Sequence, residues 1–331
     1  MNRFTSICRA INRDKDEPLN ILSFSTHEGW QSQLAKTGHH FYHVPAPEGK
    51  MWDTDYRVLP RNICEIKDEQ LGQMDGIDVI LSQTMSQAEK GFKIGRQNNI
   101  PVVSMMHTLP PDSITKKAKK EIVKQDLSTY KVFITKEARN TWGYKGSKLP
   151  MSIIEQVVDE NEFVGYGGRD RRVLTVSNDF VNRAADTGYH LWKRVLEGVD
   201  KDAIHIVGKT PGLSQVASSF EELVGFYQND RVYFNPSTHS TFPMTILEAM
   251  STGMPVVSTV NEALSEFAEN GKNGIWSNDP EELKDGIGRL LDNEMLCKKM
   301  GNAGREIVVK RFGIKRFIKQ WNKIFKEVLV K

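Results

Sequence analysis

Short apolar runs alternate along this chain with longer segments in which apolar side chains recur every three or four positions. The short runs have the length and composition of buried strands, and the longer segments have the period of helices. The runs that predict strands are residues 19–24, 41–44, 78–81, 101–105, 131–135, 153–159, 173–176, 204–207 and 231–234. Because strands that alternate with helices are typical of parallel sheets, the pattern predicts an α/β fold.

Two segments interrupt this alternation. Residues 45–72 contain three prolines and are predicted to be mostly loop. Residues 160–172 combine three glycines with charged side chains, which is typical of a linker between domains. We therefore expect two Rossmann-like domains, residues 1–160 and 161–312, followed by a C-terminal helix over residues 313–331.

The stretch from residue 235 to residue 259 reads as a strand end, a loop, a helix and a new strand. Gly253 and Pro255 end the predicted helix in the expected order. The first backbone N–H groups of such a helix lack intrahelical partners, which makes the turn a natural site for a diphosphate. Glu248 would then reach a vicinal diol such as a ribose. Alternatively, its charge only stabilises the helix N-terminus.

The same stretch resembles a known family signature. Residues 242–257 read FPMTILEAMSTGMPVV, which is similar to the F-P-x-x-x-L-E-A-M-A-x-G-x-P-V-V motif of retaining nucleotide-sugar glycosyltransferases with the GT-B fold, of the family-4 type. The resemblance implies two Rossmann-like domains that face a central cleft, with the C-terminal helix crossing back to the first domain. It also implies an enzyme that moves a sugar from a nucleotide-sugar donor to an acceptor hydroxyl with retention.

The resemblance places the donor site at the start of this helix. Glu248 maps onto the glutamate that binds the ribose. Ser240 occupies the position of a second glutamate, which contacts hydroxyls of the donor sugar. The remaining donor-binding residues are expected to be Thr241, Phe242, Pro243, Met244 and Thr245. Serine in place of that glutamate departs from the family pattern and indicates either a different donor sugar or a loss of turnover.

Cations near the diphosphate are expected to stabilise the charge that develops on the leaving group. By the resemblance, Arg183 fits the basic residue that the family carries in the loop after the first strand of the second domain. Thr187 replaces the lysine of a Lys-Gly pair, so Lys209 in the next loop is a candidate for the missing charge; alternatively, it is only a solvent-exposed lysine. In the family such groups replace a divalent metal. No convincing cluster of metal ligands stands out in the sequence, so we expect no metal and no cofactor, the nucleotide sugar being a substrate.

The acceptor side is expected on the first domain, where loops at the carboxyl ends of parallel strands carry binding sites. Thr26, His27 and Gly29 lie in the loop after the first strand. His107 opens the loop after a later strand. It either packs in the surface or, by the resemblance, faces the cleft and the sugar as a catalytic residue.

Two predicted helices rich in lysine each have two interpretations. One, residues 113–126, carries Lys116, Lys117, Lys119, Lys120 and Lys124. This lysine run is either a solvated face or the border of an anionic acceptor. The last helix, residues 314–330, has an apolar face, which packs on the first domain or lies at a membrane surface.

The acceptor itself has more than one interpretation. Family frequency favours a saccharide or a glycolipid. The short chain and the loop THEG, residues 26–29, are also similar to bacteriophage-encoded GT-B enzymes that glycosylate hydroxymethylated bases in DNA, which makes DNA the alternative acceptor. Ser240 and Thr187 suggest a further alternative, a non-catalytic relative that binds a nucleotide sugar without turnover.

Composition narrows the class of protein. At 331 residues the chain is long enough for two domains, and 39% hydrophobic and 26% charged residues are typical of a soluble globular protein. No run reaches the ~20 apolar residues of a membrane span, and the N-terminus lacks the pattern of a signal peptide. Cys8, Cys64 and Cys297 lack metal-ligand spacing. We expect a cytoplasmic protein with reduced thiols.

Overall fold

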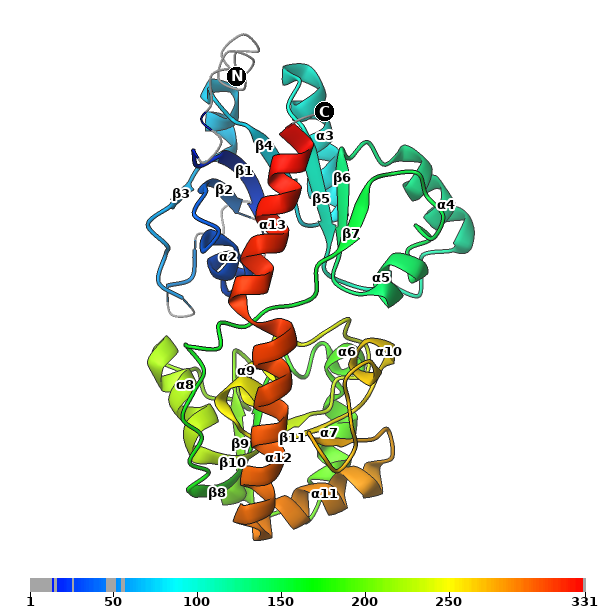
Figure 1. Cartoon of the computed structure of the whole chain (residues 1–331). Helices are drawn as coiled ribbons and strands as arrows, with labels where there is room; N and C mark the ends of the chain where they lie inside the picture. Colours follow the sequence, from blue (N-terminus) through cyan, green and yellow to red (C-terminus); the bar gives the residue numbers. More distant parts are fainter. Residues whose placement is uncertain (1–13, 15–16, 26, 46–51, 55–56, 330–331) are drawn as a thin grey trace. The chain divides into compact units, whose positions relative to one another are not determined.

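Two compact units make up the chain in the computed structural model, which describes residues 14, 17–25, 27–45, 52–54 and 57–329. Unit 1 comprises Met1–Glu155 with Lys315–Lys331, and unit 2 comprises Gln156–Ile314 (Figure 1). Each unit contains a parallel sheet with helices packed on it. The predicted α/β fold is therefore confirmed.

The sheet of unit 1 has the strand order β3-β2-β1-β4-β5-β6-β7, and every neighbouring pair is parallel. Its strands are β1 (Asn20–Ser25), β2 (His40–Pro45), β3 (Ile63–Glu65), β4 (Val79–Ser82), β5 (Val102–Met106), β6 (Tyr130–Phe133) and β7 (Met151–Ile153). Because the strands are parallel, the ends of β1, β4 and β5 that precede candidate loops meet at one edge of the sheet.

Helices connect these strands, and the C-terminal helix packs on the same unit. They are α2 (Glu28–Ala35), the 3-10 helix η1 (Asp68–Gln73), α3 (Met85–Asn98), α4 (Lys116–Gln125), α5 (Lys136–Thr141) and α13 (Ile314–Leu329). Thr84, Thr115 and Thr135 start three of them, each accepting a hydrogen bond from a backbone N–H of the first turn. Such side-chain caps satisfy donors that the helix itself leaves unpaired, which is why the helices begin where they do.

Residues 45–72 were predicted to be mostly loop, and most of the described residues there are loop, but the prediction missed β3 and most of η1. A three-residue edge strand is too short to show a period. Another prediction for unit 1 was wrong. Residues 153–159 were expected to form a strand, but β7 ends at Ile153. The apolar side chains of Ile154, Val157 and Val158 are buried in irregular structure, which apolar composition alone does not distinguish from a strand.

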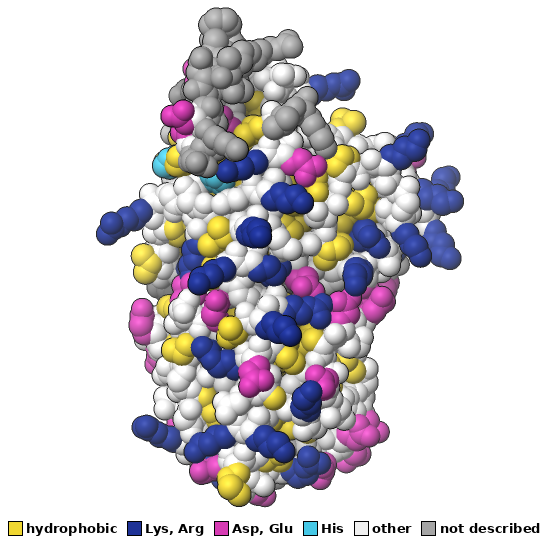
Figure 2. Space-filling model, in the orientation of Figure 1, with side chains coloured by type: hydrophobic (Ala, Val, Ile, Leu, Met, Phe, Trp, Pro, Cys, Tyr) yellow, Lys and Arg dark blue, Asp and Glu magenta, His cyan; other side chains and the backbone are white. Residues whose placement is uncertain are grey.

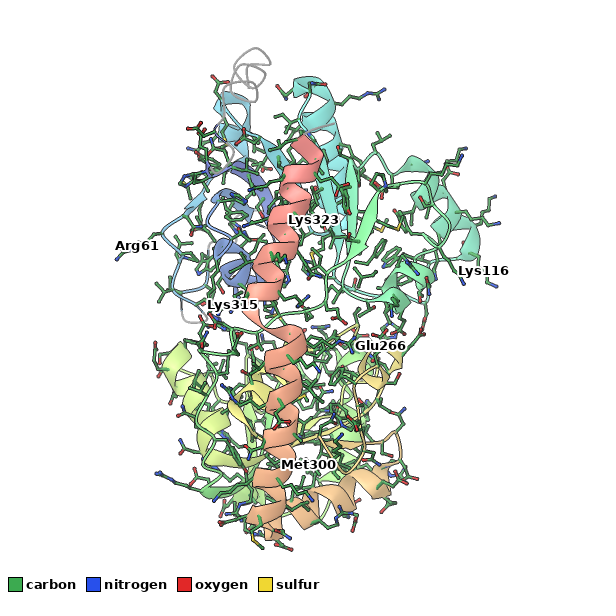
Figure 3. All side chains as sticks on the ribbon, in the orientation of Figure 1. Arg61, Lys116, Glu266, Met300, Lys315 and Lys323 are labelled. Carbon is green, nitrogen blue, oxygen red and sulfur yellow. The ribbon has the colours of Figure 1, made fainter. Side chains whose placement is uncertain are left out.

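The apolar face of α13 is buried in unit 1. Trp321 packs edge-on against Trp30 of α2, with ring centroids 5.7 Å apart, and Phe317 lies 5.9 Å from the same ring. The lysines of α13 are exposed instead; Lys315 and Lys323 are labelled in Figure 3. Since protein already covers this apolar face, it is not available to a membrane surface.

The sheet of unit 2 has the order β12-β11-β10-β8-β9, again with parallel neighbours. Its strands are β8 (Asp170–Val176), β9 (Ile204–Val207), β10 (Asp230–Asn235), β11 (Val256–Ser258) and β12 (Ile275–Trp276). Its helical segments are α6 (Ala184–Thr187), α7 (Tyr189–Val195), η2 (Lys201–Ala203), α8 (Phe220–Asn229), α9 (Met244–Thr252), α10 (Glu262–Ser265), α11 (Pro280–Asp292), α12 (Glu294–Ile307) and the π-helical η3 (Val308–Phe312). The short helix α6 lies within a segment that was predicted to be a loop.

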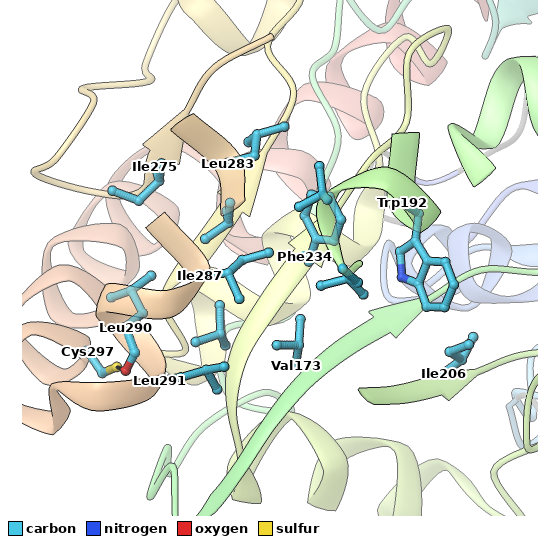
Figure 4. Close-up of a cluster of buried hydrophobic side chains, with 14 of the residues drawn as sticks. Val173, Trp192, Ile206, Phe234, Ile275, Leu283, Ile287, Leu290, Leu291 and Cys297 are labelled. Atoms are coloured by element: carbon cyan, nitrogen blue, oxygen red, sulfur yellow. Dashed lines mark hydrogen bonds between the residues drawn. The ribbon is translucent and has the colours of Figure 1, made fainter. Parts of the chain in front are cut away.

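A single cluster of buried side chains joins the sheet and helices of unit 2 (Figure 4). Val173 of β8 and Phe234 of β10 meet Trp192 of α7 and Ile287 of α11 in this cluster. Cys297 of α12 is buried there as a free thiol. This core holds the carboxyl ends of β8 and β10, and with them the loops described next.

Candidate functional site

The loop between β10 and α9 is held in place by hydrogen bonds to its neighbours. Ser237 Oγ donates to the carbonyl of Asp186 at 2.9 Å, and Thr238 Oγ1 donates to the carbonyl of Ala185 at 2.7 Å. From the other side, Asn261 Nδ2 donates to the carbonyl of Ser240 at 2.5 Å. The loop therefore has one defined course before α9 begins, as a preorganised anion site requires.

Gly188 allows this loop to approach the end of α6. Its φ is 76°, and a Cβ placed on it would lie 1.8 Å from the carbonyl oxygen of Pro236. Both the left-handed backbone and the close approach require glycine. Thr187, which replaces the family's lysine, donates its hydroxyl to the carbonyl of Phe180 at 2.8 Å. Thr187 thus supports the loop but supplies no charge.

The helix α9 starts with Pro243 as its N-cap residue and has no side-chain cap. The N–H groups of its first turn are therefore left for another partner. The hydroxyl of Thr241 is buried and has no hydrogen-bond partner in the described part of the chain. Phe242 is also buried, and its ring packs against Phe267 and Phe312 at 5.7 and 5.4 Å. Phe242 thus anchors the loop in the core of unit 2.

Glu248 lies one turn further along α9 and is almost completely buried, with 9% of its surface exposed. Tyr227 of α8 donates its hydroxyl to Glu248 Oε2 at 2.9 Å. In the same way, Tyr233 of β10 is hydrogen-bonded to Thr245 Oγ1 at 2.6 Å. Burial raises the pKa of Tyr233, and the carboxylate of Glu248 adds to that effect, so the phenol stays protonated. Two buried tyrosines therefore support neighbouring positions on one face of α9.

Neither tyrosine was predicted from the sequence to lie at the site. Tyr227 is separated from Glu248 by 21 residues and lies on another helix, so no local pattern connects the two. The helical period of residues 220–227 indicates a buried face but identifies no partner.

A pocket of about 220 Å³ opens beside this loop. It is lined by neutral polar and apolar side chains: Leu191, Asn235, Ser237, Thr238, Ser240, Pro243, Thr259, Val260, Asn261, Leu264 and Asn278. Among the described residues, Ser240 is the one polar side chain of this lining without a hydrogen bond; the others donate to backbone carbonyls or, for Asn235, to Ser258. The hydroxyl of Ser240 is thus available to a small polar ligand.

The two candidate cations lie in adjacent loops of unit 2. Arg183 is the N-cap residue of α6 and forms a half-exposed ion pair with Asp186 at 3.7 Å, which is worth little in solvent. Lys209 follows β9, and its backbone N–H donates to Asn178 Oδ1 at 2.8 Å. The N–H of Asp179 donates to the carbonyl of Lys209 at 3.1 Å, so the two loops are joined. No group of side chains suited to a metal ion is found in the described ranges.

The acceptor-side candidates of unit 1 have structural contacts of their own. Thr26 lies outside the described residues. His27 caps α2, accepting a hydrogen bond on Nδ1 from the backbone N–H of Trp30 at 3.2 Å. A Cβ on Gly29 would lie 3.0 Å from the ring of His27, so the glycine leaves room for that ring.

His107 lies directly after β5, at the same sheet edge. Its ring packs edge-on against Trp30, with centroids 4.8 Å apart, and Nε2 is hydrogen-bonded to Gln83 Oε1 at 3.0 Å. Burial, and secondarily the nearby His27, lower the pKa of His107 to about 3. The imidazole is therefore neutral at physiological pH, so it can exchange hydrogen bonds but does not act as a cation.

Residues 215–307, which include α9, match the protein family described as Glycosyl transferases group 1. Curated relatives include an uncharacterized glycosyltransferase of Methanocaldococcus jannaschii, 27% identical over 55% of this chain and 40% of that protein. They also include the N,N'-diacetylbacillosaminyl-diphospho-undecaprenol alpha-1,3-N-acetylgalactosaminyltransferase of Campylobacter jejuni, 25% identical over 63% of this chain and 50% of that protein. The chain thus spans half or less of the length of these relatives.

Solved structures resemble the chain over nearly its whole length. HepE of Anabaena in complex with UDP has a TM-score of 0.74 at 14% identity and covers 94% of this chain and 100% of its own. Sucrose-phosphate synthase of Thermosynechococcus elongatus has a TM-score of 0.71 at 14% identity, over 94% of this chain and 99% of its own. Identities this low show the fold alone.

Over the described residues, none of the helices is long and apolar enough to cross a membrane. The fold, the β10–α9 loop and the family match agree with one another. Residues 215–307 therefore match the group 1 glycosyl transferase family, and the chain has the α/β fold with parallel sheets of these solved glycosyltransferase structures.

Proposed function

We propose that this protein is a glycosyltransferase that moves a sugar from a nucleotide-sugar donor to an acceptor hydroxyl, with retention and without an essential metal. The observation that carries the proposal is the preorganised β10–α9 loop, which ends in a helix N-terminus and is followed by a carboxylate that Tyr227 holds in place. A diphosphate satisfies the free N–H groups, and Glu248 accepts from the ribose hydroxyls.

In this proposal the donor sugar binds near Ser240. The pocket beside this residue has about 220 Å³, which is below the ~300–1,000 Å³ of pockets that enclose a drug-sized ligand. It therefore suits one sugar unit but not a whole nucleotide. HepE is solved with UDP and with UDP-glucose, so uridine nucleotides are the first donors to test.

Charge develops on the leaving diphosphate as the bond to the sugar breaks. Arg183, Lys209 and the first N–H groups of α9 would stabilise that charge more in the transition state than in the ground state, which accelerates the reaction. With the acceptor on the same face of the sugar, the leaving phosphate takes the proton of the attacking hydroxyl. The configuration at the anomeric carbon is then retained.

Thermal unfolding with a panel of nucleoside diphosphates and nucleotide sugars tests the donor site. A ligand present at 100 times its dissociation constant stabilises the folded state by about 2.7 kcal/mol. We expect a clear rise in Tm with at least one uridine nucleotide and release of UDP from its sugar when acceptor is added. If no nucleotide raises Tm, the proposal fails.

We propose a saccharide or glycolipid as the acceptor. Two of the relatives have lipid-linked products or substrates in their names: the Campylobacter enzyme above, and the alpha-monoglucosyldiacylglycerol synthase of Acholeplasma laidlawii, 29% identical over 36% of this chain. A transfer assay with polyprenyl-diphosphate-linked sugars, diacylglycerol and free oligosaccharides distinguishes these acceptors by product mass.

DNA is the second candidate acceptor, and the surface of α4 favours it. This helix has no buried residue, and its five lysines have no carboxylate within ion-pair distance among the described residues. Lys116 points away from the sheet, and Lys and Arg side chains gather over α4 (Figures 2 and 3). Cations in the first turn oppose the helix dipole, so Lys116, Lys117 and Lys119 do not stabilise the helix. The exposed lysines of α4 are suited to contact the phosphates of a polyanion.

A gel-shift titration with duplex DNA at several salt concentrations decides between the two acceptors. Several phosphate contacts predict that the logarithm of the affinity falls steeply with the logarithm of salt concentration. Absence of binding at low salt would remove DNA and leave the saccharide or glycolipid.

The non-catalytic alternative rests on Ser240 and Thr187. If the protein binds a nucleotide sugar but never releases the diphosphate with any acceptor, this alternative holds. The variant Ser240→Glu then distinguishes two causes: gain of turnover indicates a degenerate site, and loss of existing turnover indicates a pocket adapted to another sugar.

A further inference from the structure

A network of uncharged polar side chains lies at the carboxyl ends of β1, β4 and β5 in unit 1. It connects Ser23 of β1, Gln31 of α2, Gln83 directly after β4 and His107 directly after β5. Ser23, Gln31 and Gln83 are almost completely excluded from solvent, with exposures of 0%, 0% and 1%. The strands β1, β4 and β5 are neighbours in the sheet, which brings these four side chains together.

The amide group of Gln83 has one orientation in this network. Its Nε2 donates to Gln31 Oε1 at 2.9 Å and approaches Ser23 Oγ at 3.4 Å. Its backbone N–H donates to Gln87 Oε1 at 3.1 Å, which fixes the start of the side chain. Because the NH₂ group faces two acceptors, the amide oxygen faces the ring of His107.

An amide oxygen accepts hydrogen bonds and cannot donate one. The contact of 3.0 Å between Gln83 Oε1 and His107 Nε2 therefore requires a proton on Nε2. A neutral imidazole carries one N–H, so Nδ1 keeps its lone pair. Among the described residues, Nδ1 of His107 has no hydrogen-bond partner. Its ring is fixed further by the edge of Trp30.

We propose that Gln83 is a positioning residue that holds His107 as the neutral Nε2–H tautomer, so that Nδ1 accepts a hydrogen bond from a hydroxyl group of a sugar ligand. The tautomer rests on the orientation of the two amides, in which Gln31 Oε1 accepts from Gln83 and Gln31 Nε2 has no partner among the described residues, whereas the ligand rests on the proposed function. On this proposal His107 orients a hydroxyl, and it neither protonates a leaving group nor pairs with a phosphate. The titratable group near the ring of His107 is His27, which lies in the loop after β1.

The tautomer can be measured directly by long-range ¹H–¹⁵N NMR on protein labelled at its histidines. The variant His107→Gln assigns the signal, and the other seven of the eight histidines are internal controls. We expect a protonated Nε2 and an unprotonated Nδ1, unchanged from pH 8 to pH 5. An Nδ1–H tautomer, or titration near the ordinary value of ~6.5, would overturn the proposal without any variant of Gln83.

Two substitutions then test the role of Gln83. Gln83→Leu removes the acceptor and should give a mixture of tautomers for His107 alone. Gln83→Glu places a carboxylate beside Nε2, which favours the imidazolium and should raise the pKa of His107 by more than one unit. If neither variant changes the His107 signal while both melt like the parent, Gln83 does not position the ring.

Kinetics with a nucleotide sugar and an acceptor test the ligand. We expect the turnover of Gln83→Glu to fall more steeply than that of the parent as the pH is lowered from 8 to 5, because the imidazolium, whose Nδ1 has no lone pair, becomes more populated. Unchanged turnover at both pH values, alongside the expected NMR change, would overturn the role of Nδ1 toward a hydroxyl. If no donor is turned over by the parent protein, the proposed function fails, and the NMR result still decides the tautomer.

Discussion

Unit 1 and unit 2 both have a parallel sheet, but their charges are opposite. Unit 1 has 28 Lys and Arg against 19 Asp and Glu, a net charge of +9, and unit 2 has 17 against 23, a net charge of −6. The proposed diphosphate site nevertheless lies in the acidic unit. Local N–H groups and two cations can outweigh net charge, because fields of exposed charges are screened within about 8–10 Å at physiological salt.

The two units also differ in how they hold their candidate polar groups. In unit 2 the charged carboxylate of Glu248 is held by a phenol of a neighbouring helix. In unit 1 the neutral imidazole of His107 is held by an amide, within a network that contains no charged side chain. The proposed diphosphate site of unit 2 thus lies beside a carboxylate, while unit 1 has neutral polar groups suited to hydroxyls and an exposed basic surface on α4.

The largest effect is expected from Gly188→Ala, which tests whether the loops of unit 2 depend on close approach. The added Cβ meets the carbonyl of Pro236 in a backbone conformation that alanine disfavours. We expect the free energy of unfolding to fall by about 3 kcal/mol or more, with loss of nucleotide binding. Chemical denaturation measures the first and thermal shift the second.

Gly198→Ala is the matched control. Gly198 also has a positive φ, 84°, but nothing lies within 4 Å of an added Cβ. It should lose only about 1–2 kcal/mol and keep nucleotide binding. Equal losses in the two variants would show that the approach of the loops contributes nothing.

Glu248→Gln tests the carboxylate that distinguishes unit 2. A hydrogen bond to a charged group is worth roughly 1.5–3 kcal/mol and a neutral one less, so donor affinity should fall about tenfold to a hundredfold. Tm should stay close to the parent value, because the amide has the same shape. Titration calorimetry with the donor measures the affinity.

The exposed Glu262, changed to Gln, is the control for Glu248 because it also lies near the start of a helix of unit 2. It should bind donor like the parent. If Glu248→Gln binds donor equally well, the carboxylate is only a helix residue. If the Glu248→Gln variant melts at a far lower temperature than the parent, the main role of Glu248 is its contact with Tyr227.

Tyr227→Phe tests the partner of Glu248 and should affect donor binding less than Glu248→Gln does. It removes one buried hydroxyl that donates to Glu248 and leaves the ring packing in place. We expect KM for the donor to rise up to about tenfold with little change in kcat, since a net hydrogen bond is worth about 0.5–3 kcal/mol. In the double variant with Glu248→Gln, the two effects should not add.

Tyr144→Phe serves as the control in unit 1. Tyr144 donates to Asp126 at 2.5 Å, a contact within unit 1 alone. It should reduce stability and leave KM for the donor unchanged. A change in KM as large as that of Tyr227→Phe would contradict the assignment of the donor to unit 2.

The smallest effect on stability is expected from replacing Lys116, Lys117, Lys120 and Lys124 by glutamine. Their side chains are exposed, so the free energy of unfolding should change by less than about 0.5 kcal/mol. Binding to duplex DNA, if present, should weaken and lose up to about four units of its salt slope. The control replaces Lys298 and Lys299 of unit 2, which should leave DNA binding unchanged.

The sequence by itself determined the alternation of strands and helices, the α/β class and the position of the β10–α9 turn. These features depend on local periodicity, on Gly253 and Pro255 as helix stops, and on residues that are close in the chain. The position of Glu248 on the helix after that turn was visible for the same reason. Short elements such as β3 and α6 were missed, because three or four residues do not show a period.

Only the tertiary structure decided which side chains meet. Tyr227 reaches Glu248 across 21 residues, Gln83 reaches His107 across 24, and Gly188 meets Pro236 through the packing of two loops. In each case the partners come from different elements that converge in the folded unit. That convergence depends on strand order, and strand order is a property of the whole unit which no stretch of sequence contains.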